Sequence, residues 1–217
     1  MGGSYHLDAG PFSQWLHGLR RALTEGGETN VPCGDCSACC SSSWFIHIRP
    51  TDERALALVP AEFVFPAAGR PEGHVVMGYD KRGRCPMLDG EWCTIYEDRP
   101  LTCRYFDCRV FPAAGIDAGC ADSSPLTARI RRWRFSYPTP RDRAEHDAVR
   151  SAAAFLRSHT AYFPDGELPL NPTAVASVAI KVYDVFLDDG QGTRTDDQCA
   201  RAVRAARKRF EAARCQR

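Results

Sequence analysis

A run of closely spaced cysteines, Cys33-Gly-Asp-Cys36-Ser-Ala-Cys39-Cys40, constrains this chain more than any other feature of its sequence. A turn of the C-x2-C type points two sulfurs toward one metal ion, and two such turns in succession place three thiols on one compact loop. Gly34 relieves backbone strain in the first turn. Neighbouring side chains diverge, so Cys40 is expected to point away from Cys39 and could serve a second centre. The run therefore predicts a thiolate metal site.

The remaining cysteines fall into two groups. The chain has 11 cysteines in 217 residues, and a chain of this length can bury an ordinary core without so many cross-links. Eight thiolates between residues 33 and 108 would suffice for two four-thiolate sites. Buried free cysteines and a disulfide framework are the alternatives. The candidate remote ligands are Cys85, Cys93, Cys103 and Cys108, whereas Cys120, Cys199 and Cys215 have no partner at ligand spacing.

The N-terminal segment bears on the cellular compartment. Residues 1–23 contain no basic stretch followed by an apolar stretch and a small-residue cleavage site. Their apolar residues recur at helical spacing and predict an amphipathic helix. No apolar run approaches the roughly 20 residues that a membrane-spanning helix needs. We therefore expect a cytoplasmic protein, whose thiols stay reduced and are available for metal.

Charge argues against nucleic acid as a partner. The formal net charge is +1 and the pI is about 7.5, which disfavours a globally basic nucleic-acid binder and leaves only local patches. The most basic short segment, residues 129–135, has alternating apolar residues that favour a packed edge strand. P-loop, dinucleotide-binding, G-x-S-x-G, HExxH and radical-SAM motifs are absent from the sequence. The sequence therefore leaves open whether the protein is an enzyme.

Local signals predict an α+β fold in three consecutive segments. Residues 1–29 form an N-terminal amphipathic helix, residues 30–120 a compact cysteine-rich metal-binding domain with short strands and loops, and residues 121–217 a helical region packed on it. Within these segments we expect strands at 44–48, 74–79 and 92–96, and a helix at 52–58 with Thr51 as its N-cap. Further helices are expected from Pro100, over 142–159, from Pro172 to before Gly190, and from Thr195 or Asp196 to Arg214.

Beyond spacing, the order and flanking residues of the cysteines resemble a known family. The run from Cys33 to Cys40, then Cys85-Pro-Met-Leu, then Cys93-Thr-Ile-Tyr-Glu-Asp-Arg-Pro100, then Cys103-Arg-Tyr-Phe106 is similar to the YkgJ-type cysteine-cluster family. That family is described as a zinc- or iron-chelating domain, and flagellin lysine N-methylase carries a similar cysteine set. The resemblance covers about residues 30–111. It implies a metal or cluster domain and no single reaction, and Cys108 is an addition to its seven-cysteine pattern.

Donor chemistry favours an iron–sulfur cluster over zinc. Only His47 and His74 lie in the cysteine-rich region, and neither has ligand spacing. A tight three-cysteine loop plus a remote cysteine is a common way to hold a 4Fe–4S cluster. Arg99 and Arg104 could contact such a cofactor, or could pair with neighbouring acids instead. The predicted function is redox or cluster-assisted modification of an unknown substrate or protein partner, and the alternative is a zinc-stabilised binding module without catalysis.

Overall fold

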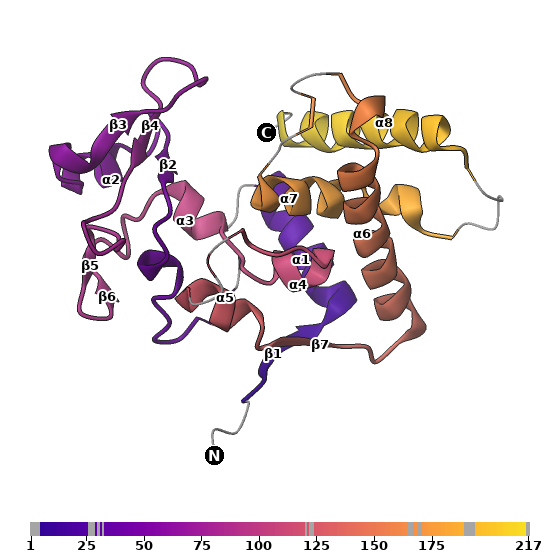
Figure 1. The fold of residues 1–217 in the computed structure, drawn as a ribbon, viewed down its shortest axis with the longest axis horizontal. Coiled ribbons are helices and arrows are strands. Elements are labelled where there is room, and N and C mark those ends of the chain that lie inside the picture. The colour runs from indigo at the N-terminus through magenta and orange to yellow at the C-terminus, as the bar shows by residue number, and fades with distance from the viewer. Residues whose placement is uncertain are drawn as a thin grey trace. The chain divides into compact units, whose positions relative to one another are not determined.

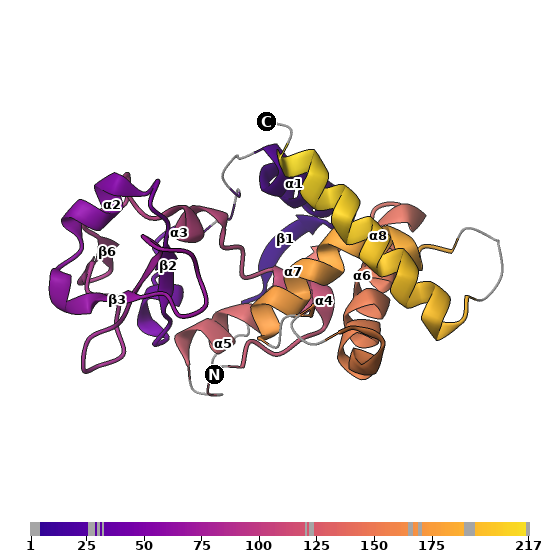
Figure 2. The same cartoon turned by 90° about the horizontal axis from the view of Figure 1, so that it is seen from above.

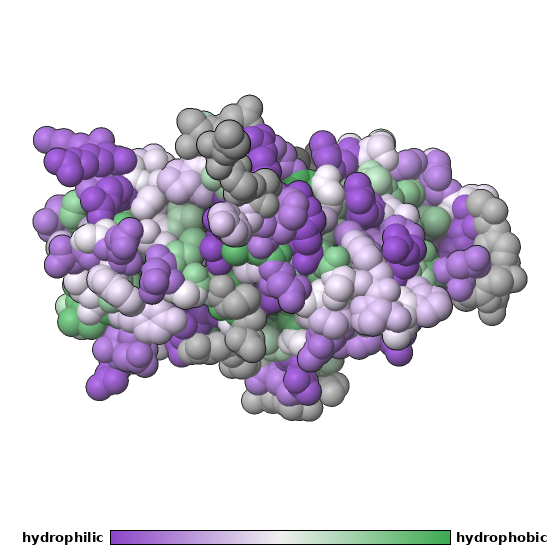
Figure 3. Space-filling model, turned by 90° about the horizontal axis from the view of Figure 1, so that it is seen from below, coloured by the Kyte–Doolittle hydropathy of each residue, from purple (hydrophilic) through white to green (hydrophobic). Residues whose placement is uncertain are grey.

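The fold was analysed in a computed structural model that describes residues 5–25, 29, 31, 33–119, 121, 124–164, 167–168, 171–188 and 194–215. The chain divides into two compact units. The helical unit comprises Met1–Gly27, Cys108–Gly119 and Ile130–Arg217, and the cysteine-rich unit comprises Glu28–Asp107 and Cys120–Arg129. Within the described ranges, no helix has the length and apolar character needed to cross a bilayer. Polar residues cover most of the face shown in Figure 3, and the hydrophobic residues there lie in separate small areas.

The helical unit is built from two strands and several helices that pack around one another (Figures 1 and 2). α1 packs on α6, α7 and α8, and α4 packs on α6 and α7. Phe12, Leu16, Phe111, Val149 and Ile180 are fully buried in this unit. Its elements are β1 (Leu7–Pro11), α1 (Phe12–Glu25), α4 (Val110–Ala114), β7 (Trp133–Ser136), α6 (Pro140–Ser158), α7 (Pro172–Val182) and α8 (Asp196–Cys215), with short 3-10 turns at Thr160–Tyr162 and Tyr183–Phe186.

The start of α6 shows how local sequence sets a helix boundary. Thr139 and Asp142 form a capping box, in which the Asp142 amide donates to the Thr139 side chain and the Thr139 amide donates to Asp142 Oδ2. Pro140 occupies the first helical turn, where a missing amide hydrogen costs nothing. The helix therefore begins two residues earlier than the expected position at residue 142.

β1 was not expected from the sequence. It pairs in parallel with β7, and Leu7 faces Trp133 while Pro11 faces Ser136. The register shifts between Asp8 and Gly10, where Gly10 has a positive φ of 81°. A five-residue segment with a glycine and a proline has little intrinsic strand preference, so only the distant partner strand makes it a strand.

The cysteine-rich unit consists of short elements joined by turns. Its strands and helices are β2 (Ile46–Ile48), α2 (Glu53–Leu58), β3 (Val64–Pro66), β4 (Val75–Met77), β5 (Leu88–Asp89), β6 (Trp92–Cys93), α3 (Leu101–Tyr105) and α5 (Pro125–Ile130), of which Ile130 is assigned to the helical unit. Cys39–Ser41 and Ala61–Phe63 are 3-10 turns. β2, β4 and β3 form an antiparallel sheet with β4 in the middle, and β5 and β6 form a separate hairpin. The mixture of short strands and helices confirms the predicted α+β class.

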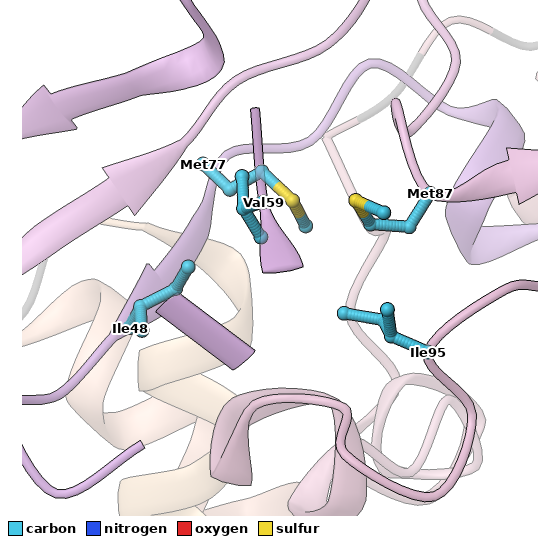
Figure 4. Close-up of a cluster of buried hydrophobic side chains, with 5 residues drawn as sticks. All are labelled: Ile48, Val59, Met77, Met87 and Ile95. Carbon is cyan, nitrogen blue, oxygen red and sulfur yellow. The ribbon is translucent and has the colours of Figure 1, made fainter. Parts of the chain in front are cut away.

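A small hydrophobic cluster forms the core of the cysteine-rich unit (Figure 4). Its five buried side chains come from β2, β4, the segment after α2, and the region around the β5–β6 hairpin: Ile48, Val59, Met77, Met87 and Ile95. Cys85 and Cys93 are partly buried and pack against this cluster. The core and two of the predicted ligands therefore share one set of contacts.

Several local expectations for this unit need correction. Asp52, not Thr51, is the N-cap residue of α2, and its side chain makes no cap hydrogen bond within that helix. The observed strands β2, β4 and β6 are shorter than the expected ranges 44–48, 74–79 and 92–96. The expected three segments also differ from the two units, because residues 108–119 contribute the buried face of α4 to the helical unit. Residues 120–129, in turn, join the cysteine-rich unit.

Candidate metal centre

The first cysteine loop is a series of tight turns. The Cys36 amide donates to the Cys33 carbonyl oxygen at 3.1 Å, which closes the first C-x2-C turn. Gly34 lies within that turn at φ 54°, a left-handed conformation that glycine adopts without strain. The second step ends in the 3-10 turn at Cys39–Ser41, and the hydroxyl of Ser42 donates to the Ala38 carbonyl oxygen at 2.7 Å. The loop thus holds its cysteines through backbone and hydroxyl hydrogen bonds.

A second turn brings Cys85 to the first loop. Asp80 Oδ1 accepts the backbone amides of Arg82 and Arg84, both at 2.8 Å, and fixes the turn that precedes Cys85. The Cys85 amide then donates to the Cys40 carbonyl oxygen at 2.7 Å. Gly83 lies against Ser43 in the same junction, where an added Cβ would come within 2.2 Å of Ser43 Oγ. Two segments distant in sequence therefore meet backbone to backbone beside their cysteines.

The β5–β6 hairpin positions Cys93. Leu88 pairs with Cys93 across the hairpin, and the Leu88 amide donates to the Cys85 carbonyl oxygen at 3.0 Å. The amide and the hydroxyl of Thr94 both donate to the Met87 carbonyl oxygen, at 2.9 and 3.1 Å. These bonds keep Cys85 and Cys93 on one short, closed segment.

Cys103 is carried by α3, which two side chains attach to the rest of the unit. Asp52 Oδ1 accepts the Leu101 amide at 3.0 Å, at the start of α3. The hydroxyl of Thr102 donates to the His47 carbonyl oxygen on β2 at 2.7 Å. The helix is five residues long and would not persist alone, so these tertiary bonds fix the direction of Cys103.

Three thiols from the two loops are directly hydrogen-bonded. The Cys40 thiol bonds with the thiols of Cys39 and Cys85. The bond to Cys40 lowers the pKa of Cys39 to about 7 and that of Cys85 to about 7, while these bonds and burial raise the pKa of Cys40. The side chain of Cys40 therefore links the first loop to Cys85 electrostatically.

Four of the five other predicted thiols interact electrostatically with this group or with one another. Desolvation raises the pKa of Cys103 to about 12, with further contributions from Cys39, Cys85 and Cys93. Desolvation of the sulfur also raises the pKa of Cys33 to about 11, although the residue as a whole is exposed, and Cys39 and Cys36 add to the shift. These effects link the thiols of seven cysteines, which we call the coupled set: Cys33, Cys36, Cys39, Cys40, Cys85, Cys93 and Cys103.

The cysteines that the structure describes are all free thiols. Taken as they stand, the described residues form no group of three or more histidine, cysteine, aspartate or glutamate donors arranged to hold a metal ion. The donors themselves fit a thiolate site, since all are sulfur.

Two arginines act on the thiols from different elements. Arg129 on α5 opposes the rise in the pKa of Cys33 that burial causes, and it adds to the larger lowering of the pKa of Cys39 by Cys40. Its Nη2 lies 3.5 Å from the Cys33 carbonyl oxygen. Arg99 opposes the rise in the pKa of Cys93 and Cys103 that burial causes. Its guanidinium also lies over the Tyr96 ring at 3.8 Å.

Sequence reasoning identified Arg99 but missed Arg129. The alternating apolar residues of segment 129–135 favour a packed strand, but Arg129 lies in the last turn of α5. The Leu126 amide of α5 donates to the hydroxyl oxygen of Ser42 at 3.2 Å. Arg104, the other predicted cofactor contact, has its Nη2 3.8 Å from Asp52 Oδ1. No signal in the sequence pairs residue 129 with the cysteine loop.

Cys108 is placed differently from the seven thiols above. It belongs to the helical unit, is 8% exposed, and accepts a hydrogen bond from the Trp133 indole at 3.1 Å. Cys199 lies on α8 in the same unit, and burial raises its pKa. Cys120 and the side chain of Cys215 lie outside the described residues.

The two histidines of the region bind each other. His47 Nε2 lies 2.8 Å from His74 Nδ1, and the rings are nearly parallel, with centroids 5.0 Å apart. His47 lies in β2, and His74 directly precedes β4.

One comparison with known proteins gives a match. Residues 32–121 match the CxxCxxCC family, whose description is "Putative zinc- or iron-chelating domain". The match confirms the resemblance that the cysteine spacing and flanking residues indicated, and it supports binding of zinc or iron by this part of the chain. No curated protein and no solved structure matches the chain.

Proposed function

We propose that the cysteine-rich unit holds an iron–sulfur cluster and that the protein uses it in a redox reaction or a cluster-assisted modification. The proposed ligands come from the seven thiols of the coupled set, with Cys39 at its centre. The proposal includes a reducing, cytoplasmic environment, because the thiols must stay reduced to bind metal. Such a cluster supplies one-electron transfer when it is bound.

One observation carries the proposal: three separate chain segments deliver only thiols to one neighbourhood. Cys39 and Cys40 come from the first loop, Cys85 and Cys93 from the next turn and hairpin, and Cys103 from α3. The Cys85 amide donates to the Cys40 carbonyl oxygen at 2.7 Å, and Cys93 pairs with Leu88, whose amide donates to the Cys85 carbonyl oxygen at 3.0 Å. Buried thiols of this number cost free energy when several ionise together, and a polynuclear cation offsets that cost.

The surrounding residues suit a centre of net negative charge. Arg99 and Arg129 favour the thiolate forms of the cysteines nearest to them. A cluster with four thiolate ligands carries excess negative charge, and nearby cations and amide groups stabilise its reduced form. Arg104 pairs with Asp52 and in this proposal holds α3, and with it Cys103, beside the cofactor.

Zinc is the second candidate, because the matched family description names zinc as well as iron. Thiolates alone hold structural zinc in tetrahedral sites. In that case the protein would be a zinc-stabilised binding module with no catalysis. The two candidates share ligands and differ in metal, colour and redox activity.

Anaerobic purification separates the candidates. We expect a brown protein that contains iron and acid-labile sulfide. Its sulfur-to-iron charge-transfer bands should give a broad visible absorption, which dithionite should bleach. A colourless protein with stoichiometric zinc under the same conditions would overturn the iron–sulfur proposal and support the zinc module.

Substitutions test the ligand set. Cys39→Ser and Cys103→Ser should lose metal or release it readily, because both thiols lie within the coupled set. Cys199→Ser is the matched control and should keep its full metal content, as should the double variant with Cys215→Ser. Cys108→Ser should also retain metal, because its thiol accepts the Trp133 indole hydrogen in the helical unit. Loss of a full equivalent of metal from either Cys108→Ser or the double variant would contradict this assignment.

A further inference from the structure

The first cysteine loop and the turn before Cys85 meet along a short antiparallel contact. The Cys85 amide donates to the Cys40 carbonyl oxygen at 2.7 Å, and the Ser43 amide donates to the Gly83 carbonyl oxygen at 2.9 Å. Between these two bonds the chain advances by three residues on the loop side, from 40 to 43, and by two on the turn side, from 83 to 85. The loop side therefore carries one extra residue, as one strand of a β-bulge does.

Ser43 accommodates this extra residue with a left-handed backbone. Its φ is 55°, and among the residues that the structure describes it is the only non-glycine residue with a positive φ. Residues with a Cβ are strained in this conformation, whereas glycine adopts it freely. Ser43 is exposed, so packing of its side chain does not impose the conformation. The hydrogen bonds that join it to Gly83 therefore hold it in place.

The acceptor of those hydrogen bonds is fixed in a closed turn. The Gly83 carbonyl oxygen receives the Ser43 hydroxyl at 3.3 Å as well as the Ser43 amide. The Gly83 amide donates to the Asp80 carbonyl oxygen at 2.9 Å, and the Asp80 amide donates to the Arg84 carbonyl oxygen at 2.8 Å. Because bonds within the turn already close it, the conformational adjustment falls on Ser43.

Close approach leaves little freedom at this junction. Gly83 has a φ of 73°, and an added Cβ there would collide with Ser43 Oγ. A left-handed serine and a left-handed glycine thus lie against each other. Backbone strain of this kind persists only where the surrounding structure over-determines it, and it clusters at functional sites.

The place of the junction in the chain ties it to the candidate metal centre. Ser43 follows Cys40 by three residues, and Gly83 precedes Cys85 by two. A slip of one residue in such a pairing would turn the side chains of one segment to the other side. We propose that Ser43 is a positioning residue of the metal centre, whose left-handed backbone sets the register that brings Cys40 beside Cys85. This role rests on the proposed thiolate site and applies whether that site holds an iron–sulfur cluster or zinc.

A series of substitutions at residue 43 tests this role in the full-length, metal-loaded protein. Ser43→Gly should retain metal as the parent protein does, because glycine takes a positive φ without strain, and Ser43→Ala should retain it less firmly. Ser43→Val, which is β-branched, should lose half of its metal at an EDTA concentration about 10- to 100-fold lower, the range found when residues that orient metal ligands are replaced. Elemental analysis after dialysis measures the metal that remains.

The same substitutions at Ser41 are the matched control. Ser41 lies in the same loop, at the end of the 3-10 turn, and its φ is not positive. At such a position glycine gives the unfolded chain more freedom than alanine does. Ser41→Gly should therefore retain metal no better than Ser41→Ala, whereas at residue 43 the glycine variant should retain it better.

A second measurement locates the defect. Iodoacetamide alkylation of metal-loaded Ser43→Val, mapped by peptide mass spectrometry, should modify Cys40 and Cys85 before Cys103. A substitution that only loosened the whole cysteine-rich unit would expose all three thiols together.

Gly83→Ala tests the junction from the opposite side, and it replaces Ser43→Val if that variant does not fold. Its added methyl group meets Ser43 Oγ, so Ser43→Gly should restore part of the lost metal retention. Gly90→Ala is the control for this rescue, because Gly90 also has a positive φ, of 58°, but an added Cβ there meets no atom within 4 Å. Ser43→Gly should not rescue Gly90→Ala.

Three results would overturn the proposal. Equal metal retention in the glycine, alanine and valine variants of residue 43 would refute the role of Ser43 and leave the proposed metal site intact. Simultaneous alkylation of Cys40, Cys85 and Cys103 in Ser43→Val would make the effect a general loss of structure. A parent protein that holds no metal at its thiols would refute the proposed site together with this role.

Discussion

The helical unit and the cysteine-rich unit differ in how much apolar surface each can bury. α6 and α7 of the helical unit pack against each other and against α1 and α4, with Phe111, Val149 and Ile180 fully buried. The cysteine-rich unit has a cluster of five buried side chains, and two of its cysteines complete that cluster. Burial of apolar area is the main source of folding stability. The cysteine-rich unit therefore gains much less stability from its core than the helical unit does.

Buried or turn-forming carboxylates hold two turns of the cysteine-rich unit. Asp52 receives the amides of Arg49 and Leu101, and Asp80 receives those of Arg82 and Arg84. Single hydrogen bonds contribute about 0.5–1.5 kcal/mol each, so they define the loops without supplying a large surplus of stability. The comparison predicts that a metal bound by the cysteine-rich unit stabilises that unit far more than it stabilises the helical unit.

Metal removal should have the largest effect, and it should destabilise the cysteine-rich unit alone. Chelation of the purified protein, or Cys36→Ser with Cys39→Ser, should unfold the cysteine-rich unit, because metal binding supplies folding free energy there. The amides of β2 and α3 should then lose protection in hydrogen exchange, while those of α6 and α7 keep theirs. Equal protection in both units after complete metal removal would contradict this prediction.

Replacing a fully buried isoleucine by alanine in each core should give the next largest difference between the two units. Ile48 and Ile180 are both fully buried, the first in the cysteine-rich unit and the second in the helical unit. Ile48→Ala and Ile180→Ala should each cost about 2–5 kcal/mol. The loss should unfold the smaller unit and leave the larger one folded, which thermal melting with unit-specific hydrogen exchange can measure. Similar unfolding in both variants would show that the two units share one cooperative transition.

A buried carboxylate in the helical unit tests whether that unit can be destabilised without loss of metal. Glu145 is 1% exposed, and its Oε1 lies 2.9 Å from both His17 Nε2 and Arg141 Nε. Glu145→Gln removes the charge and keeps the shape, and we expect it to destabilise this unit by about 1–3 kcal/mol. Urea unfolding followed at α6 measures the effect. The metal content should stay unchanged, and a variant that lost metal would link the two units directly.

The smallest predicted effect lies at the start of α6. Thr139→Ala should cost about 1 kcal/mol, as the loss of an N-cap does elsewhere. The hydrogen bond from Thr139 is the largest cause that lowers the pKa of Asp142 to about 2, so the carboxylate is ionised in the folded protein. Its contribution is therefore present at neutral pH and is lost as the pH falls from about 4 toward 2. Acid titration of Thr139→Ala should show a weaker loss over that range than the parent protein shows.

Much of the candidate site could be predicted from the sequence, because cysteine spacing acts locally. The turns at Cys33–Cys36 and Cys39–Ser41 follow from C-x2-C spacing and from Gly34. The match over residues 32–121 confirms the resemblance to a zinc- or iron-chelating domain that the flanking residues indicated. Whether iron–sulfur or zinc is bound does not follow from spacing, since both metals take four thiolates.

Other parts of the site depend on contacts between distant segments. Arg129 reaches the cysteine loop because α5 is bound by Ser42, and nothing near residue 129 in the sequence indicates that contact. β1 was missed for the same reason, because its partner β7 lies far along the chain. Propensity describes a residue and its neighbours, and it carries no information on such pairings.

By itself, the sequence determined the thiol donors, their order and the helices whose caps and apolar spacing are local. Only the tertiary structure decided that the Cys85 amide donates to the Cys40 carbonyl oxygen, that residues 108–119 belong to the helical unit, and that Phe45 and Phe65 both lie close to Gly78. The physical reason is the range of the interactions. Turns and caps act over a few residues, whereas strand register and the approach of separate loops are set by packing of the whole unit.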